Sequence, residues 1–211
     1  MLNWEYTFLR WIVENTHNKF FDVMFTIITL LGELAVVFFA MSIAMIFFKK
    51  TRRAGLVSLF ALIFVAGFNN FVFKILVARP RPFLHAGVTD DATWLANYMV
   101  DYGAQSKLNE FLVPSSFAFM SGHTLSAFIF AFIVSIYHPK WSVPAIIFSA
   151  LMAYSRLYFA FHYPTDVIAG LITAGITAVG FYFLVKKHET TFIRWWFAIV
   201  GKFKKPKPEE E

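Results

Sequence analysis

Long apolar runs separated by short charged segments constrain this chain more than any other feature. The five runs cover approximately residues 20–48, 54–77, 122–136, 142–158 and 166–185. A run of about 20 apolar residues can cross a bilayer as an α-helix, because a helix satisfies its own backbone hydrogen bonds. A soluble globular domain is excluded, since 58% of the residues are hydrophobic and only 15% are charged. We therefore predict an all-α, polytopic transmembrane helix bundle with five long spans.

The length of the chain suits one such bundle, and nothing in its middle indicates a linker between domains. We expect a single membrane-embedded domain over residues 1–205, with a second interfacial helix at residues 192–203. Residues 206–211, P-K-P-E-E-E, are predicted to form a disordered cytoplasmic tail. The chain has no cysteine, which excludes disulfides and thiolate catalysis.

Residues 2–17 have the period of an amphipathic helix. Its polar positions are Asn3, Thr7, Arg10 and Glu14. Its apolar positions each come directly before one of these polar residues, and they are Leu2, Tyr6, Leu9 and Val13. With Trp4 and Trp11, this helix is expected to lie in the headgroup layer. Packing against the bundle is the main alternative, and a sixth membrane helix is another.

Basic residues between the first two runs set the predicted orientation. Lys49, Lys50, Arg52 and Arg53 lie together there. By the positive-inside rule this turn belongs in the cytoplasm. Counting crossings from it places Lys74, Ser121 and residues 155–166 on the extracytoplasmic face, with the turn at His138 inside. The net charge of +6 is explained by a membrane surface rather than by nucleic acid, because the cations flank apolar runs.

Three polar patterns lie beside different apolar runs and indicate phosphoryl chemistry. They are K-x6-R-P from Lys74 to Pro82, S-G-H from Ser121 to His123, and S-R-x5-H-x3-D from Ser155 to Asp166. The arginine guanidinium is a planar fork of donors that matches phosphate oxygens. A neutral histidine with a carboxylate behind it can act as a nucleophile or as a base.

In these patterns the chain resembles the type 2 phosphatidic acid phosphatase family, also called lipid phosphate phosphatases. The signatures occur in the family's order, and the resemblance covers roughly residues 20–185. Met120 stands where the family usually has proline before Ser-Gly-His, which affects the loop more than the chemistry. The family more often has six spans, so five spans plus an amphipathic N-terminal helix is a second departure.

The resemblance implies three catalytic residues. His162 would attack phosphorus and form a phosphohistidine, which water then hydrolyses, while Asp166 would orient and polarise it. The local sequence is consistent with these roles of His162 and Asp166. Pro164 marks a helix start, and Asp166 falls in the first turn, where a carboxylate is favoured. His123 would be the general acid that protonates the leaving lipid oxygen, and its alternative role is to cap the helix start.

The resemblance also implies a phosphate-binding set of Lys74, Arg81, Ser121, Gly122 and Arg156. These groups would stabilise charge on the equatorial oxygens of the transition state. The alternative for the lysine and for Arg81 is snorkelling to the membrane interface.

Other polar residues have weaker interpretations. Arg79 lies off the pattern, so it is a weaker candidate for the phosphate site, and the alternative is that it faces the lipid headgroups. His85 is expected to be a loop histidine rather than a ligand. Glu33 lies inside the first run and is predicted to pair with a site cation such as Lys74. Asn69 and Asn70 are expected to pack between helices.

The long connection over residues 83–120 is expected to carry a short interfacial helix over the site mouth, because loops of this length are usually functional or disordered. It contains Trp94, Leu95, Tyr98, Met99 and Tyr102. No metal or other cofactor is predicted, because the acidic residues have no recognisable ligand spacing.

These features predict a membrane lipid phosphatase that acts on a phosphate monoester or diphosphate. Undecaprenyl diphosphate, phosphatidylglycerophosphate and phosphatidate all remain as substrates, although the small size and amphipathic start are similar to bacterial undecaprenyl diphosphate phosphatases. One alternative is a non-catalytic lipid binder or transporter on the same fold. Another is a lipid phosphotransferase that uses the same residues.

Overall fold

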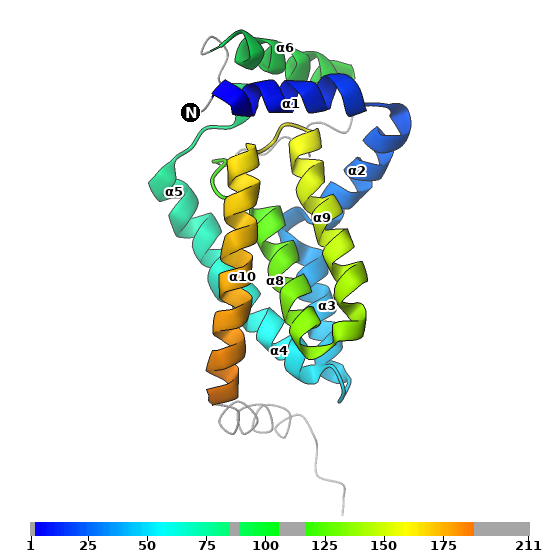
Figure 1. Cartoon of the computed structure of the whole chain (residues 1–211), viewed down its shortest axis with the longest axis vertical. Helices are drawn as coiled ribbons and strands as arrows, with labels where there is room; N and C mark the ends of the chain where they lie inside the picture. Colours follow the sequence, from blue (N-terminus) through cyan, green and yellow to red (C-terminus); the bar gives the residue numbers. More distant parts are fainter. Residues whose placement is uncertain (1–2, 85–88, 106–116, 188–211) are drawn as a thin grey trace, which may run out of the picture.

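The structure, a computed structural model, describes residues 3–84, 89–105 and 117–187, and all its regular elements there are helices. The helices that form the bundle are α2 (Lys19–Leu31), α3 (Val36–Phe47), α4 (Arg52–Ala61), α5 (Lys74–Val77), α8 (Gly122–Tyr137), α9 (Ser142–Tyr158) and α10 (Pro164–Lys187). Two further helices, α1 (Asn3–Thr16) and α6 (Asp90–Gln105), lie across one end of it (Figure 1). The predicted interfacial helix at 192–203 and the tail at 206–211 lie outside the described residues.

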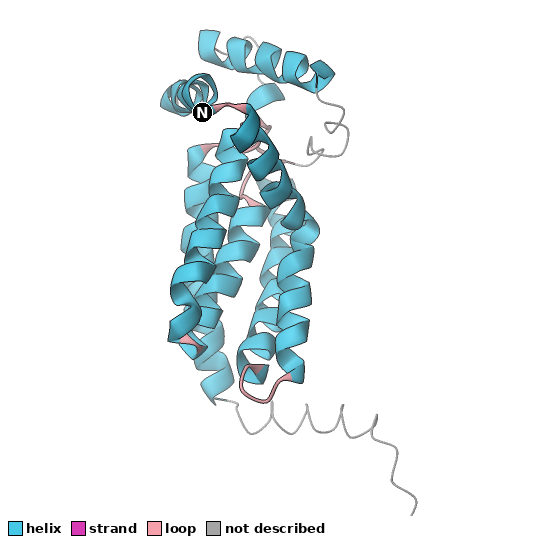
Figure 2. Ribbon diagram, turned by 90° about the vertical axis from the view of Figure 1, so that its right-hand side faces the viewer, coloured by secondary structure: helices cyan, strands magenta, loops and turns pink. Residues whose placement is uncertain are grey.

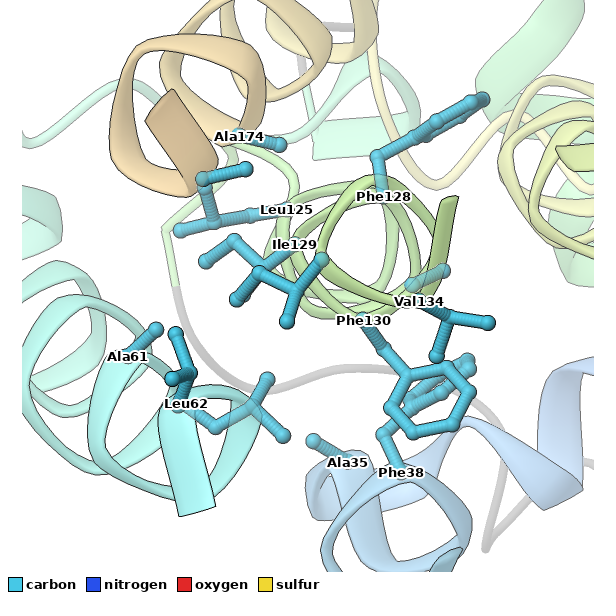
Figure 3. Close-up of a cluster of buried hydrophobic side chains, with 14 of the residues drawn as sticks. Ala35, Phe38, Ala61, Leu62, Leu125, Phe128, Ile129, Phe130, Val134 and Ala174 are labelled. Carbon is cyan, nitrogen blue, oxygen red and sulfur yellow. The ribbon is translucent and has the colours of Figure 1, made fainter. Parts of the chain in front are cut away.

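Helix α8 is the centre of the bundle and packs against α4, α9 and α10. It is buried on nearly all sides, as expected for a helix that is apolar all round. Figure 3 shows its side chains directed towards α3, α4 and α10. The labelled members of this apolar cluster are Ala35, Phe38, Ala61, Leu62, Leu125, Phe128, Ile129, Phe130, Val134 and Ala174.

Two helical segments are long and apolar enough to cross a membrane, Arg52–Leu84 and Pro164–Lys187. The pair α2 and α3 passes the same test as one bent span. Helix α8 has 16 residues and α9 has 17, which at 1.5 Å per residue is shorter than a hydrocarbon core of about 30 Å. The all-helical membrane bundle is therefore confirmed, whereas the count of five spans remains a prediction.

The first predicted span, 20–48, is broken rather than continuous. Helices α2 and α3 meet at an angle of 56°, joined by Gly32 and the short 3-10 helix η1 (Glu33–Ala35). Ala35 has a left-handed φ of 58°. The second span is continuous but contains two π-helical segments, η2 (Leu62–Ala66) and η3 (Asn69–Phe73), which lead into α5. Such segments are frequent near functional sites.

The N-terminal helix α1 packs on the bundle end and on α6 (Figure 1, Figure 2). Tyr6, Leu9 and Val13 are buried as the pattern predicts, while Trp4 and Trp11 are 48% and 57% exposed. Packing against the bundle, one of the predicted alternatives, is thus present. The short helix predicted in the long connection is also confirmed as α6, which is tied to α1 by a 3.0 Å ion pair between Arg10 and Asp91.

Candidate active site

The three sequence patterns meet at the end of the bundle that α1 and α6 cover. The first lies after α5, the second opens α8, and the third runs from the end of α9 to the start of α10. Arg81 Nη1 lies 3.0 Å from His162 Nε2. Arg156 Nη1 lies 3.5 Å from His123 Nε2. The turn between α3 and α4 and the turn between α8 and α9 lie at the opposite end (Figure 1).

The short loop between α9 and α10 positions His162. Its backbone N–H donates to the carbonyl of Arg156, as does that of Phe161, and this folds the loop back on the end of α9. Helix α10 then begins at Pro164, where a proline is pre-organised for a first turn. Asp166 lies in that turn, and its Oδ2 accepts a 2.9 Å hydrogen bond from the Tyr163 N–H. The carboxylate therefore faces back towards the histidine.

The contacts of His162 define which ring nitrogen can react. A guanidinium can only donate, so the Nε2 atom that faces Arg81 carries the lone pair and the proton is on Nδ1. The Nδ1 atom has no hydrogen-bond partner among the described residues and lies 3.6 Å from Asp166 Oδ2. Burial, and then the positive charges of Arg81, Arg156 and Lys74, hold the pKa of His162 well below its ordinary value. The imidazole is therefore neutral, as a nucleophile must be.

Three buried cations surround this histidine. The exposed fractions are 7% for Lys74, 2% for Arg81 and 2% for Arg156. These side chains are therefore enclosed by protein and do not snorkel to the interface. Arg156 donates to the Thr29 hydroxyl and lies over the ring of Phe161 at 4.7 Å. Positive charge that is concentrated and withdrawn from water favours the binding of an anion.

The start of α8 adds backbone groups to the site. Ser121 is the N-cap residue, and its hydroxyl accepts from the Thr124 N–H at 3.4 Å. A Cβ added at Gly122 would lie 3.3 Å from Asn70 Oδ1 and 3.8 Å from Lys74 Nζ. The glycine thus leaves the helix N-terminus open beside the lysine, and a helix N-terminus is itself a phosphate site.

His123 is held by the break in the first span. Its Nε2 lies 3.3 Å from the Thr29 carbonyl and 3.6 Å from the Glu33 carboxylate. A Cβ added at Gly32 would lie 2.6 Å from His123 Cδ2 and 2.5 Å from Met152 Sδ. Sequence reasoning did not identify Gly32 or Thr29, although a Gly-Glu pair within an apolar run was a visible signal.

Glu33 is half exposed, and its closest polar contact among those described is with His123 rather than with Lys74. It is near enough to the lysine to interact electrostatically, so their predicted pairing remains a prediction. Asn69 packs between helices as expected, donating to the Met120 carbonyl at 3.3 Å. Asn70, for which the same was expected, is exposed. His85 lies outside the described residues. No group of three or more possible metal ligands occurs within 3–84, 89–105 and 117–187.

The suggestion that Arg79 faces headgroups is wrong. Its side chain is only 14% exposed and pairs with two carboxylates, those of Glu5 and Asp166. The physical reason is that Glu5 belongs to the buried face of α1, where an unpaired carboxylate would be costly. Glu5 was also missed by sequence reasoning. It lies on the opposite side of α1 from the polar stripe, and that was the available signal.

Comparison with known proteins agrees with this arrangement. Residues 54–190 match the model of the PAP2 superfamily. The chain belongs to this superfamily. It is 26% identical over 202 residues to undecaprenyl-diphosphatase BcrC of Bacillus subtilis, and the match covers 92% of both chains.

Two solved structures share the fold. One is the PAP2 type phosphatidylglycerolphosphate phosphatase from Bacillus subtilis, with a TM-score of 0.61 and 21% identity, over 87% of this chain and 85% of that one. The other is LpxE of Aquifex aeolicus, with a TM-score of 0.61 and 24% identity, over 82% and 92%. The predicted membership of a lipid phosphatase family is confirmed. The individual roles of the site residues remain proposals.

Proposed function

We propose that this chain removes a phosphate from undecaprenyl diphosphate at the extracytoplasmic face, through a phosphohistidine on His162. The observation that carries the chemistry is the buried neutral imidazole, whose Nε2 lone pair faces Arg81, with Lys74 and Arg156 near enough to act on the ring electrostatically. A binder of lipid phosphates needs the cations but has no use for a nucleophile. The substrate is inferred from the similarity to the Bacillus subtilis undecaprenyl-diphosphatase over nearly the whole chain.

In the first step, Nε2 attacks the terminal phosphorus and forms an N–P bond. The bond from phosphorus to the bridging oxygen breaks, and His123 gives a proton to that oxygen as the lipid monophosphate leaves. Arg81, which occupies the position in front of Nε2, turns its donors to the phosphate oxygens when substrate enters. Lys74, Arg156, the Ser121 hydroxyl and the Gly122 N–H stabilise the charge on the equatorial oxygens.

In the second step, water attacks phosphorus and His123 takes its proton. The N–P bond breaks, inorganic phosphate leaves, and His162 returns to its neutral form. Asp166 stabilises the positive charge of the phosphorylated ring from the Nδ1 side. The present 3.6 Å separation shortens in this step, because catalytic hydrogen bonds are often long before substrate binds.

The extracytoplasmic orientation is supported by the basic turn at residues 49–53, which lies at the opposite end of the bundle from the site. The site and its covering helices then lie at the outer surface, where a lipid headgroup can enter from the membrane plane. Labelling of a cysteine introduced at exposed Lys140 in intact cells checks this. The cysteine should react with a membrane-impermeant reagent only after permeabilisation.

Phosphate release by the purified protein in detergent tests the activity. Undecaprenyl diphosphate, phosphatidylglycerophosphate and phosphatidate are compared, with the His162→Ala variant as control. We expect fastest release from the diphosphate and a loss of at least about 10³-fold in the variant. A different ranking would overturn the substrate, and release from none would favour a lipid binder. Products formed on an added alcohol acceptor instead of water would indicate a phosphotransferase.

A further inference from the structure

The carboxylate of Glu5 is buried, although it belongs to a helix at the membrane surface. The residue is 0% exposed, whereas Glu14 on the same helix has a side chain that is 42% exposed. Its Oε1 accepts a hydrogen bond from the Thr165 hydroxyl at 2.5 Å, and its Oε2 accepts one from Arg79 Nη2 at 2.6 Å. Both carboxylate oxygens are thus bound, one to Arg79, which also pairs with Asp166, and one to Thr165, which precedes Asp166 in the chain.

Arg79 joins this carboxylate to Asp166. Its Nη1 donates to Asp166 Oδ1 at 2.5 Å while its Nη2 holds Glu5, so one planar guanidinium bridges two buried acids. The guanidinium also lies 3.9 Å from the ring centroid of Tyr163. The Tyr163 hydroxyl is hydrogen-bonded to the Tyr6 hydroxyl of α1 at 2.9 Å. Helix α1 therefore holds both the arginine and the ring beneath it.

Asp166 itself has few ways to move. Its Oδ1 is held by Arg79, and its Oδ2 accepts from the Tyr163 N–H and faces His162 Nδ1. If Arg79 had only Asp166 as a partner, its full charge would oppose the interaction of Asp166 with a positively charged imidazole. The negative charge of Glu5 compensates part of the charge on Arg79, and its hydrogen bond fixes the plane of the guanidinium. Asp166 therefore remains available to the histidine.

We propose that Glu5 and Arg79 are positioning residues that act on His162 through Asp166, so that helix α1 is part of the catalytic apparatus. This inference rests on the proposed phosphatase function. Neither residue belongs to the three sequence patterns, and neither touches His162 in the contacts described. Their effect is on the rate of the chemical steps, not on the affinity for phosphate, which depends on Lys74, Arg81 and Arg156.

The test compares Glu5→Gln with Glu14→Gln, since both remove one carboxylate from α1 and keep its shape. Glu14 pairs only with Arg10 at the surface in the contacts described. We expect Glu5→Gln to lower kcat about 10-fold to 100-fold, as is found for groups that orient a catalytic residue. KM and the Kd for vanadate should stay within about twofold of wild type, and Glu14→Gln should leave all three constants unchanged. The stoichiometry of vanadate binding reports the folded fraction and separates slow chemistry from loss of protein.

Two further variants keep the proposal falsifiable if Glu5→Gln folds poorly. Arg79→Lys keeps the charge but cannot bridge both carboxylates with a planar fork, and the same loss of kcat is expected. Asp166→Asn removes the group through which both act, so adding Glu5→Gln to it should cause little further loss. Equal loss from Glu5→Gln with and without Asp166 would overturn the proposal, as would a wild-type kcat in both Glu5→Gln and Arg79→Lys. A wild-type protein that releases no phosphate from any lipid would instead overturn the proposed function and, with it, this inference.

Discussion

The site end of the bundle and its middle are held together by different interactions. At the site end, buried charged residues contact one another across elements, as in the bridge from Glu5 through Arg79 to Asp166. In the middle, α8 meets its neighbours through aliphatic and aromatic side chains, such as Ile129 against α4 (Figure 3). A polar contact between helices in this region is the hydrogen bond from Ser149 to the Ala127 carbonyl.

This difference separates function from stability. Buried charges are costly in a membrane and are retained where they serve a site or pathway. Apolar packing is non-directional and tolerates substitutions that conserve volume. Changes at the site end should therefore reduce catalysis with little effect on unfolding, and changes in the middle should do the reverse.

Among the variants that test this difference, Arg156→Ala is expected to have the largest effect. Removing this buried guanidinium takes away a donor from the transition state, so kcat/KM should fall by about 10²-fold to 10³-fold. The Kd for vanadate should rise at least about 10-fold, as measured by competition against phosphate release. The apparent Tm in detergent should change little, because the lost contacts with Thr29 and Phe161 are offset by relief of the repulsion from Lys74 and Arg81. Lys140→Ala, at an exposed turn, is the matched control, and a similar loss in that variant would contradict the site.

Gly32→Ala should have the next largest effect on activity. The added Cβ cannot fit between His123 and Met152 without displacing one of them, so we expect kcat to fall about 10-fold because His123, the proposed general acid, is displaced. Gly67→Ala is the control, because a Cβ there meets nothing within 4 Å. An undiminished kcat in Gly32→Ala would show that His123 does not need this close approach.

Ile129→Ala should affect stability and leave activity per folded molecule unchanged. The residue is fully buried in the middle of α8, and truncation should cost about 2 to 4 kcal/mol in the free energy of unfolding. Ile172→Ala, at a position that is 57% exposed on α10, should cost much less. Unfolding followed by circular dichroism in detergent measures both. Equal costs would mean that contacts with lipid or detergent matter as much as the core.

The smallest effect is expected for Ser149→Ala, which removes the hydrogen bond from α9 to α8. Interhelical hydrogen bonds in membranes average about 0.6 kcal/mol, so a slight decrease in Tm is predicted. Ser135→Ala removes a hydroxyl that donates only to the Ala131 carbonyl of its own helix, and it should change the Tm less. A decrease larger than that of Ile129→Ala would show that the middle of the bundle is not held mainly by apolar packing.

Much of this arrangement could be predicted from the sequence, because its signals are local. The apolar runs placed the helices, and the three patterns placed His123, His162 and Asp166 at helix ends. Their meeting at one end followed from counting crossings, and the structure brings them together. The helix α6 could be expected from the length of its connection and its aromatic residues.

The remaining features depend on contacts between distant segments. The bend at Gly32 exists because α2 and α3 pack around His123, which is far along the chain. The two carboxylate partners of Arg79 are 74 and 87 residues away in the chain, and no local sequence pattern predicts them. The number of spans is also not fixed by hydropathy alone, because α8 and α9 have only 16 and 17 residues, fewer than the roughly 20 that a hydrocarbon core requires.

The contact between Glu5 and Thr165 joins residues that are 160 positions apart. At a synthesis rate of about 5 to 20 residues per second, the first helix is made roughly 10 to 30 s before its partner exists. Because an unpaired carboxylate is costly in the hydrocarbon core, we expect α1 to stay at the membrane surface during that interval. The nucleophile and its support come together only when α10 has entered the membrane. If His162 is the nucleophile, as proposed, phosphate release can begin only after α10 has been inserted, and a chain that ends before α10 is inactive.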